Sequence, residues 1–319
     1  MGSSNGNPFT PFFERQGTVI LDGGLATELE AQGADLGDTL WSARLLRDDP
    51  AAIVRAHRAF LDAGADVVTT ATYQATFEGF ASHGLSAGES EALLLRGVAL
   101  GLEARDTFWG ESETPHRLRP LVAASVGPYG AYLADGSEYR GDYGLSARAL
   151  VEFHRRRFEL LATAGADVLA CETIPSLDEG LALARLLRET PTARGWITFS
   201  CADDRHLADG TPFTEAVAAL DTAADGSLLA VGVNCTAPRH VAALLTAAAR
   251  VTARPLVAYP NSGEGWDAAH KRWLPTQDPV HPAALATHWT RGGARLVGGC
   301  CRTTPGDIRT LRHRLLTNP

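Results

Sequence analysis

Short apolar runs that alternate with helical patterns constrain the fold of this 319-residue chain more than any other feature. Each run has the length of one strand, and each is followed by a helix or by a stretch that contains one. Strict alternation of this kind implies parallel β/α units. The predicted strands are Thr18–Leu21, Asp66–Thr70, Leu121–Ser125, Asp167–Ala170, Trp196–Ser200, Leu229–Val233, Pro255–Tyr259 and Ala294–Val297. These eight units predict a single closed (β/α)8 barrel.

Local stop signals support these boundaries. Pro50 opens a helical pattern that ends at Gly64, and the next strand follows two residues later. The segment Ala63–Val67 recurs as Ala164–Val168, so the same helix stop passes directly into a strand twice. A doubly wound open sheet is the alternative fold. Against it, Asp22–Gly24 lacks the spaced glycines of a dinucleotide-binding turn.

Composition excludes several classes of partner and compartment. The formal net charge is -8 and no basic run occurs, which argues against nucleic acid or an anionic membrane surface as partner. No apolar segment approaches the roughly 20 residues that cross a bilayer, and the polar start is not a signal peptide. Five cysteines, an odd number, do not make a disulfide framework, so a reducing cytoplasmic compartment is expected. We expect residues 1–16 to form a flexible tail and residues 17–319 to form the barrel domain.

Polar side chains follow most of the predicted strands. In (β/α)8 barrels the active site lies at the C-terminal ends of the strands, so these side chains should meet at one mouth. The residues at the strand ends are Asp22, Thr69, Thr70, Ser125, Glu172, Cys201, Asn234, Cys235, Asn261, Cys300 and Cys301.

Three of these strand-end residues predict a metal site. Cys235 follows the sixth strand, and Cys300 and Cys301 follow the eighth, so the barrel brings distant thiols together. Thiolate ligands favour a soft metal, usually zinc, and a set of three leaves the fourth tetrahedral position open for substrate. The alternatives are core packing of the thiols and a vicinal disulfide, because the spacing matches no Cys-x-x-Cys zinc motif.

Two carboxylates are expected at the same mouth. Asp22 and Glu172 could bind a substrate ammonium group, hold a turn or act as acid or base. Alternatively, Asp22 could be a turn aspartate that bonds to backbone amides, and Glu172 could form a salt bridge at the barrel rim. Cys171 should face the helices because it alternates with Glu172 along the strand, and Cys201 is assigned to packing. The long polar loop Gly127–Gly144, which contains four tyrosines, is expected to be functional.

With these residues in place, the chain resembles the homocysteine S-methyltransferase family over about residues 17–315. Five segments carry the resemblance. They are Asp22–Leu29, Ser125–Tyr139, Gly232–Cys235, Tyr259–Glu264 and Gly298–Pro305. The loop Gly127–Tyr143 is most similar to the subgroup that uses S-methylmethionine or S-adenosylmethionine as methyl donor.

The resemblance implies a (β/α)8 barrel that holds one zinc ion per chain through Cys235, Cys300 and Cys301. It also implies that Asp22 and Glu172 contact the amino group of L-homocysteine, and Asn234, within a family motif, is assigned to substrate binding. Trp41, Tyr129 and Tyr132 are candidates to receive the cationic donor on their aromatic faces. Gln74 stands where the betaine-using branch has its second aromatic residue, which makes betaine a doubtful donor.

The resulting function is zinc-dependent transfer of a methyl group from a sulfonium donor to the thiol of homocysteine, giving methionine. Because a free thiol has a pKa of about 8.5, zinc binding would supply the thiolate without a dedicated protein base. The alternatives are a methyltransferase acting on selenocysteine or another thiol, a zinc hydrolase with Glu172 as base, and a redox role for Cys300 and Cys301. A homo-oligomer is compatible with the exposed ring of helices.

Overall fold

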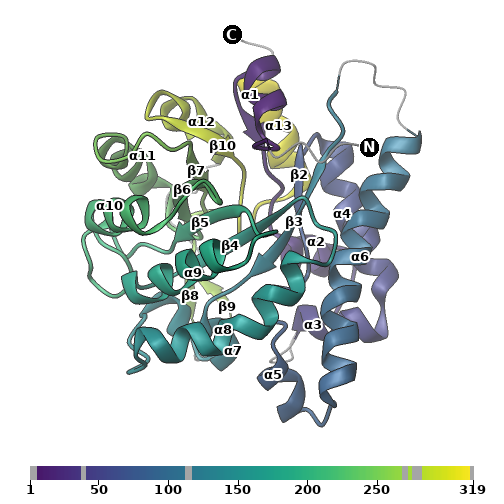
Figure 1. The fold of residues 1–319 in the computed structure, drawn as a ribbon. Helices are drawn as coiled ribbons and strands as arrows, with labels where there is room; N and C mark the ends of the chain where they lie inside the picture. The colour runs from purple at the N-terminus through teal and green to yellow at the C-terminus, as the bar shows by residue number, and fades with distance from the viewer. Residues whose placement is uncertain (1–5, 37–40, 112–116, 268–271, 275–281, 317–319) are drawn as a thin grey trace.

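The computed structural model describes residues 6–36, 41–111, 117–267, 272–274 and 282–316. Within them a single eight-stranded parallel sheet has the order β1-β10-β7-β6-β5-β4-β3-β2 (Figure 1). Its strands are β1 (Val19–Ile20), β2 (Val67–Thr69), β3 (Leu121–Val126), β4 (Val168–Ile174), β5 (Gly195–Phe199), β6 (Leu228–Asn234), β7 (Leu256–Tyr259) and β10 (Ala294–Val297). A parallel bridge between Leu21 and Val67 joins the two end strands and completes the barrel. The predicted (β/α)8 fold is therefore confirmed.

Helices surround the strands (Figure 1). They are α2 (Leu25–Ala31), α3 (Trp41–Asp48), α4 (Pro50–Ala63), α5 (Phe77–Ser82), α6 (Ala87–Glu111), α8 (Ala147–Ala162), α9 (Leu177–Glu189), α10 (Phe213–Ala223), α11 (Pro238–Ala248), α12 (Pro282–Arg291) and α13 (Pro305–Leu316). Pro50 and Gly64 delimit α4 as predicted, with Gly64 in the left-handed region at φ 109°. No helix of the described segments is long and apolar enough to cross a membrane.

Two hydrophobic layers hold the barrel together. The larger layer lies between the strands and the helices, and it includes Cys171, which confirms the predicted orientation of that thiol. The smaller layer fills the barrel and contains Trp196 and Leu296. The alternation of side chains along each strand separates the two layers, and the same alternation turns Glu172 inward.

A short N-terminal helix, α1 (Thr10–Gln16), lies against the strands (Figure 1). Phe9 and Phe12 are buried in the inner layer, and the rings of Phe9 and Trp196 are 6.0 Å apart. The sequence predicted a flexible tail over residues 1–16. Within that segment the structure shows a helix over Thr10–Gln16, and Phe9 and Phe12 cover inner-layer side chains. The flexibility of the tail stays a prediction. Residues 1–5 lie outside the described part of the chain.

Further elements without a sequence prediction lie in the loops. The hairpin β8 (Gly265–Asp267) and β9 (Arg272–Leu274) follows β7. After β3, the segment that was predicted to be a long polar loop contains α7 (Tyr129–Leu133) and a 3-10 turn, η1 (Ser137–Tyr139). These two elements carry side chains to the mouth of the barrel.

Candidate active site

Three thiols meet at the C-terminal end of the barrel. The Sγ atoms of Cys235 and Cys301 are 3.6 Å apart, and those of Cys300 and Cys301 are 4.0 Å apart. All three Sγ atoms lie within 4.8 Å of one another. The predicted convergence of β6 and β10 is therefore present.

The backbone around these thiols is tightly packed. The N–H of Cys235 donates to the carbonyl of Tyr259, and the N–H of Cys300 donates to the carbonyl of Pro260, so both ligand loops are tied to the end of β7. A Cβ atom at Gly299 would lie 2.1 Å from the Thr303 side chain. Only glycine fits at this position, because a real Cβ does not approach another heavy atom so closely.

Asn234 joins β6 to β4 just beneath the thiols. Its Oδ1 accepts from the Thr173 N–H at 2.7 Å, and its Nδ2 donates to the Thr173 hydroxyl at 2.8 Å. Nδ2 also lies 3.9 Å from the Sγ of Cys300. Thr173 has a φ of 61° and Cys235 a φ of 47°, which are strained values for residues other than glycine. The two Asn234 bonds hold Thr173 in this conformation.

The three thiols form one group of close sulfur contacts. Hydrogen bonding with the thiols of Cys300 and Cys301 holds the pKa of Cys235 well below its usual range. The Tyr139 hydroxyl, 3.3 Å from the Cys235 Sγ, adds to this effect. Since metal ligands must be thiolates, the arrangement favours the ionised form at one sulfur before any ligand binds.

Asp22 and Glu172 lie in the same mouth and are both buried. Asp22 accepts from the Thr69 N–H at 2.7 Å and from the Thr69 hydroxyl at 3.1 Å, and Glu172 accepts from the Ser125 hydroxyl. Burial, with a smaller contribution from the nearby charge of Glu172, raises the pKa of Asp22 to about 8. Burial also raises the pKa of Glu172 to about 7. In the described residues neither carboxylate has a salt bridge, so a cationic ligand would find two unpaired acids.

The loop after β3 covers the thiols with η1. Tyr139 reaches Cys235, and the backbone carbonyl of Glu138 accepts from the Ser200 hydroxyl at 2.9 Å. Burial is the main cause that raises the pKa of Glu138 to about 7, and the charges of Cys235 and Asp135 contribute to the rise. The loop therefore brings a tyrosine and a third carboxylate to the three thiols.

A buried polar network supports this loop from below. Arg157 donates to the carbonyl of Gly127 at 2.6 Å, and its Nη2 lies 3.0 Å from the Nδ1 of His154. Glu179 accepts from the Tyr129 N–H at 2.6 Å and lies 2.8 Å from the Nε2 of His154. The start of α7 is thus held by a carboxylate from α9. His154 belongs to this support.

The structure brings together six of the residues that the sequence singled out. They are Cys235, Cys300, Cys301, Asn234, Asp22 and Glu172. Tyr129 and Tyr132 lie in an aromatic cluster with Tyr143 and Phe153, so their contact with a donor stays a prediction. Trp41 begins α3, but its side chain lies outside the described residues.

Three residues of the mouth had no assigned role in the sequence: Glu138, Tyr139 and Tyr73. The length of the loop and its tyrosines pointed to the segment that carries Glu138 and Tyr139. Burial raises the pKa of Tyr73 well above its usual value, and the charges of Glu138 and Cys235 raise it further, which places this ring beside both groups. Nothing in the local sequence distinguished Tyr139 from the other loop tyrosines.

The donor set fits a tetrahedral zinc ion. With zinc–sulfur bonds of about 2.3 Å, ligand sulfurs lie roughly 3.8 Å apart. The Sγ–Sγ distances of 3.6 Å from Cys235 to Cys301 and 4.0 Å from Cys300 to Cys301 bracket this value. Three thiolates are soft ligands, and a fourth position remains for a substrate sulfur.

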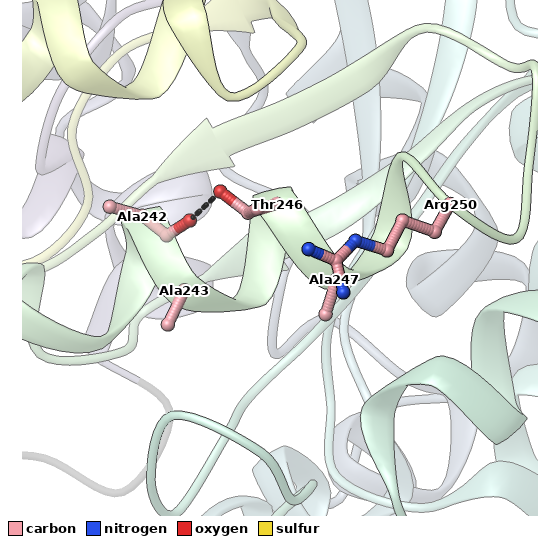
Figure 2. A pocket seen from close by; sticks show the side chains of 5 residues that line it. All are labelled: Ala242, Ala243, Thr246, Ala247 and Arg250. Atoms are coloured by element: carbon pink, nitrogen blue, oxygen red, sulfur yellow. Dashed lines mark hydrogen bonds between the residues drawn. The ribbon is translucent and has the colours of Figure 1, made fainter.

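A second concave surface lies on the outside of α11. It is a shallow hollow lined by Ala242, Ala243, Thr246, Ala247 and Arg250 (Figure 2). The Thr246 hydroxyl donates to the Ala242 carbonyl of its own helix at 2.8 Å, so it is already satisfied. This hollow has no carboxylate, thiol or imidazole, and we assign no chemistry to it.

Fold and site together define a barrel with a group of three cysteines at its mouth that could hold a metal ion. The sequence profile described as homocysteine S-methyltransferase matches residues 19–315, and the chain belongs to this family. It is 48% identical to the homocysteine S-methyltransferase of Escherichia coli (strain K12), with 98% of this chain and 99% of that protein covered. It is 46% identical to homocysteine S-methyltransferase YbgG of Bacillus subtilis (strain 168), with 96% of each covered.

A solved structure agrees with this relationship. The chain superimposes on the metallated form of the homocysteine methyltransferase MmuM from Escherichia coli with a TM-score of 0.86 and 45% identity. The match covers 97% of this chain and 100% of that one. The family resemblance read from the sequence is therefore confirmed.

Proposed function

We propose that this protein transfers a methyl group from a sulfonium donor, S-methylmethionine or S-adenosylmethionine, to the thiol of L-homocysteine. The observation that carries the proposal is the group of three thiols at 3.6 and 4.0 Å, at the mouth of a barrel of this family. Cys235, Cys300 and Cys301 would hold one zinc ion. Bound zinc supplies Lewis acidity that lowers the pKa of a substrate thiol.

The remaining residues position the two substrates. Asp22 and Glu172 would pair with the ammonium group of homocysteine, because both are buried acids without a described salt bridge. Asn234 keeps the Cys300 sulfur in place through its contact at 3.9 Å and its two bonds to Thr173. With both substrates aligned, the new sulfur–carbon bond forms as the old one breaks, and the donor leaves as a neutral thioether. Alignment alone can contribute several kcal/mol to such a step, on the order of 7–11 in well-oriented systems.

Two competing functions have weaker support. A zinc hydrolase more often uses His and carboxylate ligands, whereas the described cluster is all thiolate. A methyltransferase for selenocysteine or another thiol would use the same groups, and comparison of acceptors decides between them. The proposal also includes a reducing, cytoplasmic location, in keeping with five free cysteines, and a homo-oligomer stays a prediction.

The test compares metal content with methionine formation in the wild type and in Cys300→Ala. Homocysteine would be offered with S-methylmethionine, S-adenosylmethionine and betaine in parallel. We expect about one zinc per chain and activity with a sulfonium donor, both lost in Cys300→Ala. Cys201→Ala is the matched control, because this half-buried thiol packs against the outer core and should keep metal and activity. A metal-free wild type that is inactive with all three donors would refute the proposal.

A further inference from the structure

Glu138 is the carboxylate of the mouth that homocysteine binding leaves unexplained. Its backbone is fixed by the Ser200 hydroxyl at 2.9 Å, and its neighbour Tyr139 touches the Cys235 sulfur at 3.3 Å. The Oε2 atom of Glu138 is buried and has no hydrogen-bond partner among the described residues. Burial of a carboxylate oxygen without a hydrogen-bond partner costs free energy, and a bound ligand that donates to this oxygen would remove that cost.

Arg140 acts on Glu138 through its charge, which lowers the pKa of that carboxyl, but the two side chains form no salt bridge among the described residues. Arg140, two residues later in the same loop, pairs instead with Asp135 at 3.6 Å and Asp142 at 3.4 Å. Within the described segments, no salt bridge involves Glu138. The charge on this carboxylate therefore remains available to a cation that arrives with a substrate.

The substrates bring more positive charge than Asp22 and Glu172 can pair. Homocysteine carries one ammonium group, whereas each sulfonium donor carries an ammonium group and the sulfonium itself. Asp22 follows β1 and Glu172 lies in β4, and the charge of Glu172 acts on Asp22, whereas Glu138 comes from the covering loop beside Cys235. Asp22 and Glu172 thus lie on the barrel, where homocysteine would bind, and Glu138 lies on the loop that covers this site.

We propose that Glu138 binds the α-ammonium group of the methyl donor, the group that S-methylmethionine and S-adenosylmethionine share. This inference rests on the proposed function and adds the donor-binding residue to it. The ammonium is the better partner because its charge persists through the reaction. A carboxylate placed against the sulfonium would stabilise a charge that disappears in the transition state, and would slow the transfer.

The test measures KM for each substrate in Glu138→Gln, which keeps the shape and removes the charge. Loss of a charge-assisted hydrogen bond should raise KM for S-methylmethionine about tenfold or more, with KM for homocysteine within about twofold. Glu138→Asp retains the charge and should recover part of the donor affinity. The matched control is Asp142→Asn, which removes a carboxylate from the same loop with 74% of its side chain exposed and should change neither KM.

A second donor separates the two cations. Dimethylsulfoniopropionate has the sulfonium but no ammonium group, so Glu138→Gln should not weaken its binding, measured as turnover or as competition with S-methylmethionine. An equal loss for both donors would place Glu138 at the sulfonium and overturn the proposal. A changed homocysteine KM with an unchanged donor KM would also overturn it, with the methyltransferase assignment intact. Only a wild type that is inactive with every sulfonium would refute the function itself.

Discussion

Gly130 is the position where one added methyl group tests how the loop controls the site. A Cβ atom there would lie 2.3 Å from the backbone N of Glu138 and 2.7 Å from the hydroxyl oxygen of Tyr143. Contacts to backbone become ordinary only at 3.4 Å or more. In Gly130→Ala the η1 turn must therefore move by about 1 Å away from α7, since 3.4 minus 2.3 Å is 1.1 Å.

This displacement should impair the reaction without removing the metal site. It breaks or lengthens the 3.3 Å contact from Tyr139 to Cys235 and the 2.9 Å bond from Ser200 to the Glu138 carbonyl. A misplacement of about 1 Å can cost about 10²-fold in rate, so we expect kcat/KM for the donor to fall by that order. The thiols stand on the ends of β6 and β10 and should still bind metal.

The assay is steady-state kinetics with metal analysis and urea unfolding on the same preparation. Alanine favours a helix over glycine by about 1 kcal/mol, which offsets part of the strain, so the unfolding midpoint should change little. Gly88→Ala is the control, because Gly88 is also helical and a Cβ there meets nothing within 4 Å. A Gly130→Ala enzyme with wild-type kcat/KM would show that η1 does not position the donor.

Two further predictions concern buried charge. The pKa of His57 is lowered to about 4 by burial, so the unfolded chain takes up this proton first and stability falls from about pH 6.5 toward 4. As the pH falls from 7.5 to 4.5, the free energy of unfolding of His57→Leu should rise by up to about 3 kcal/mol relative to that of the wild type. A difference in urea unfolding that does not change with pH would contradict this. Arg157→Leu should lower the free energy of unfolding by about 3–5 kcal/mol at pH 7, because the buried side chain of Glu179 loses the cation on which its charge acts. Unchanged urea unfolding would contradict this.

The comparison of wild type and His57→Leu is needed because other buried groups act in the opposite direction. Asp22, Glu138 and Glu172 have raised pKa values, so the folded protein binds their protons more tightly and their contribution to stability falls as pH rises. These acids are present in both proteins, and their effect cancels in the difference.

The barrel and the thiol centre were predictable because both follow from regular patterns. Eight parallel strands that alternate with helices close into a (β/α)8 barrel. In this barrel the C-terminal ends of the strands meet at one mouth. Cys235 and Cys301 are 66 residues apart, yet their sulfurs lie at 3.6 Å. The inward direction of Glu172 and the outward direction of Cys171 follow from the two-residue period of a strand.

The covering loop was not predictable in the same way. Its position depends on contacts between distant segments: Gly130 lets η1 approach α7, and Ser200 fixes the Glu138 carbonyl. Since a loop has no period that fixes side-chain direction, four tyrosines in one segment are equivalent in the sequence. The structure separates them: Tyr139 touches a sulfur, whereas Tyr129 and Tyr132 pack with Phe153.

Backbone strain shows why the site needs the whole barrel. Among the described residues, the non-glycine positions with positive φ are Ala134, Thr173, Cys235 and Arg302. Ala134 ends α7 in the covering loop, and Thr173 is bonded to Asn234. Cys235 is one of the three thiols, and Arg302 directly follows another, Cys301. Each such conformation costs on the order of 1–3 kcal/mol, which no local sequence preference supplies. The strands and their cross-bonds must hold these residues in place, so the thiols are fixed by packing before a metal or substrate binds.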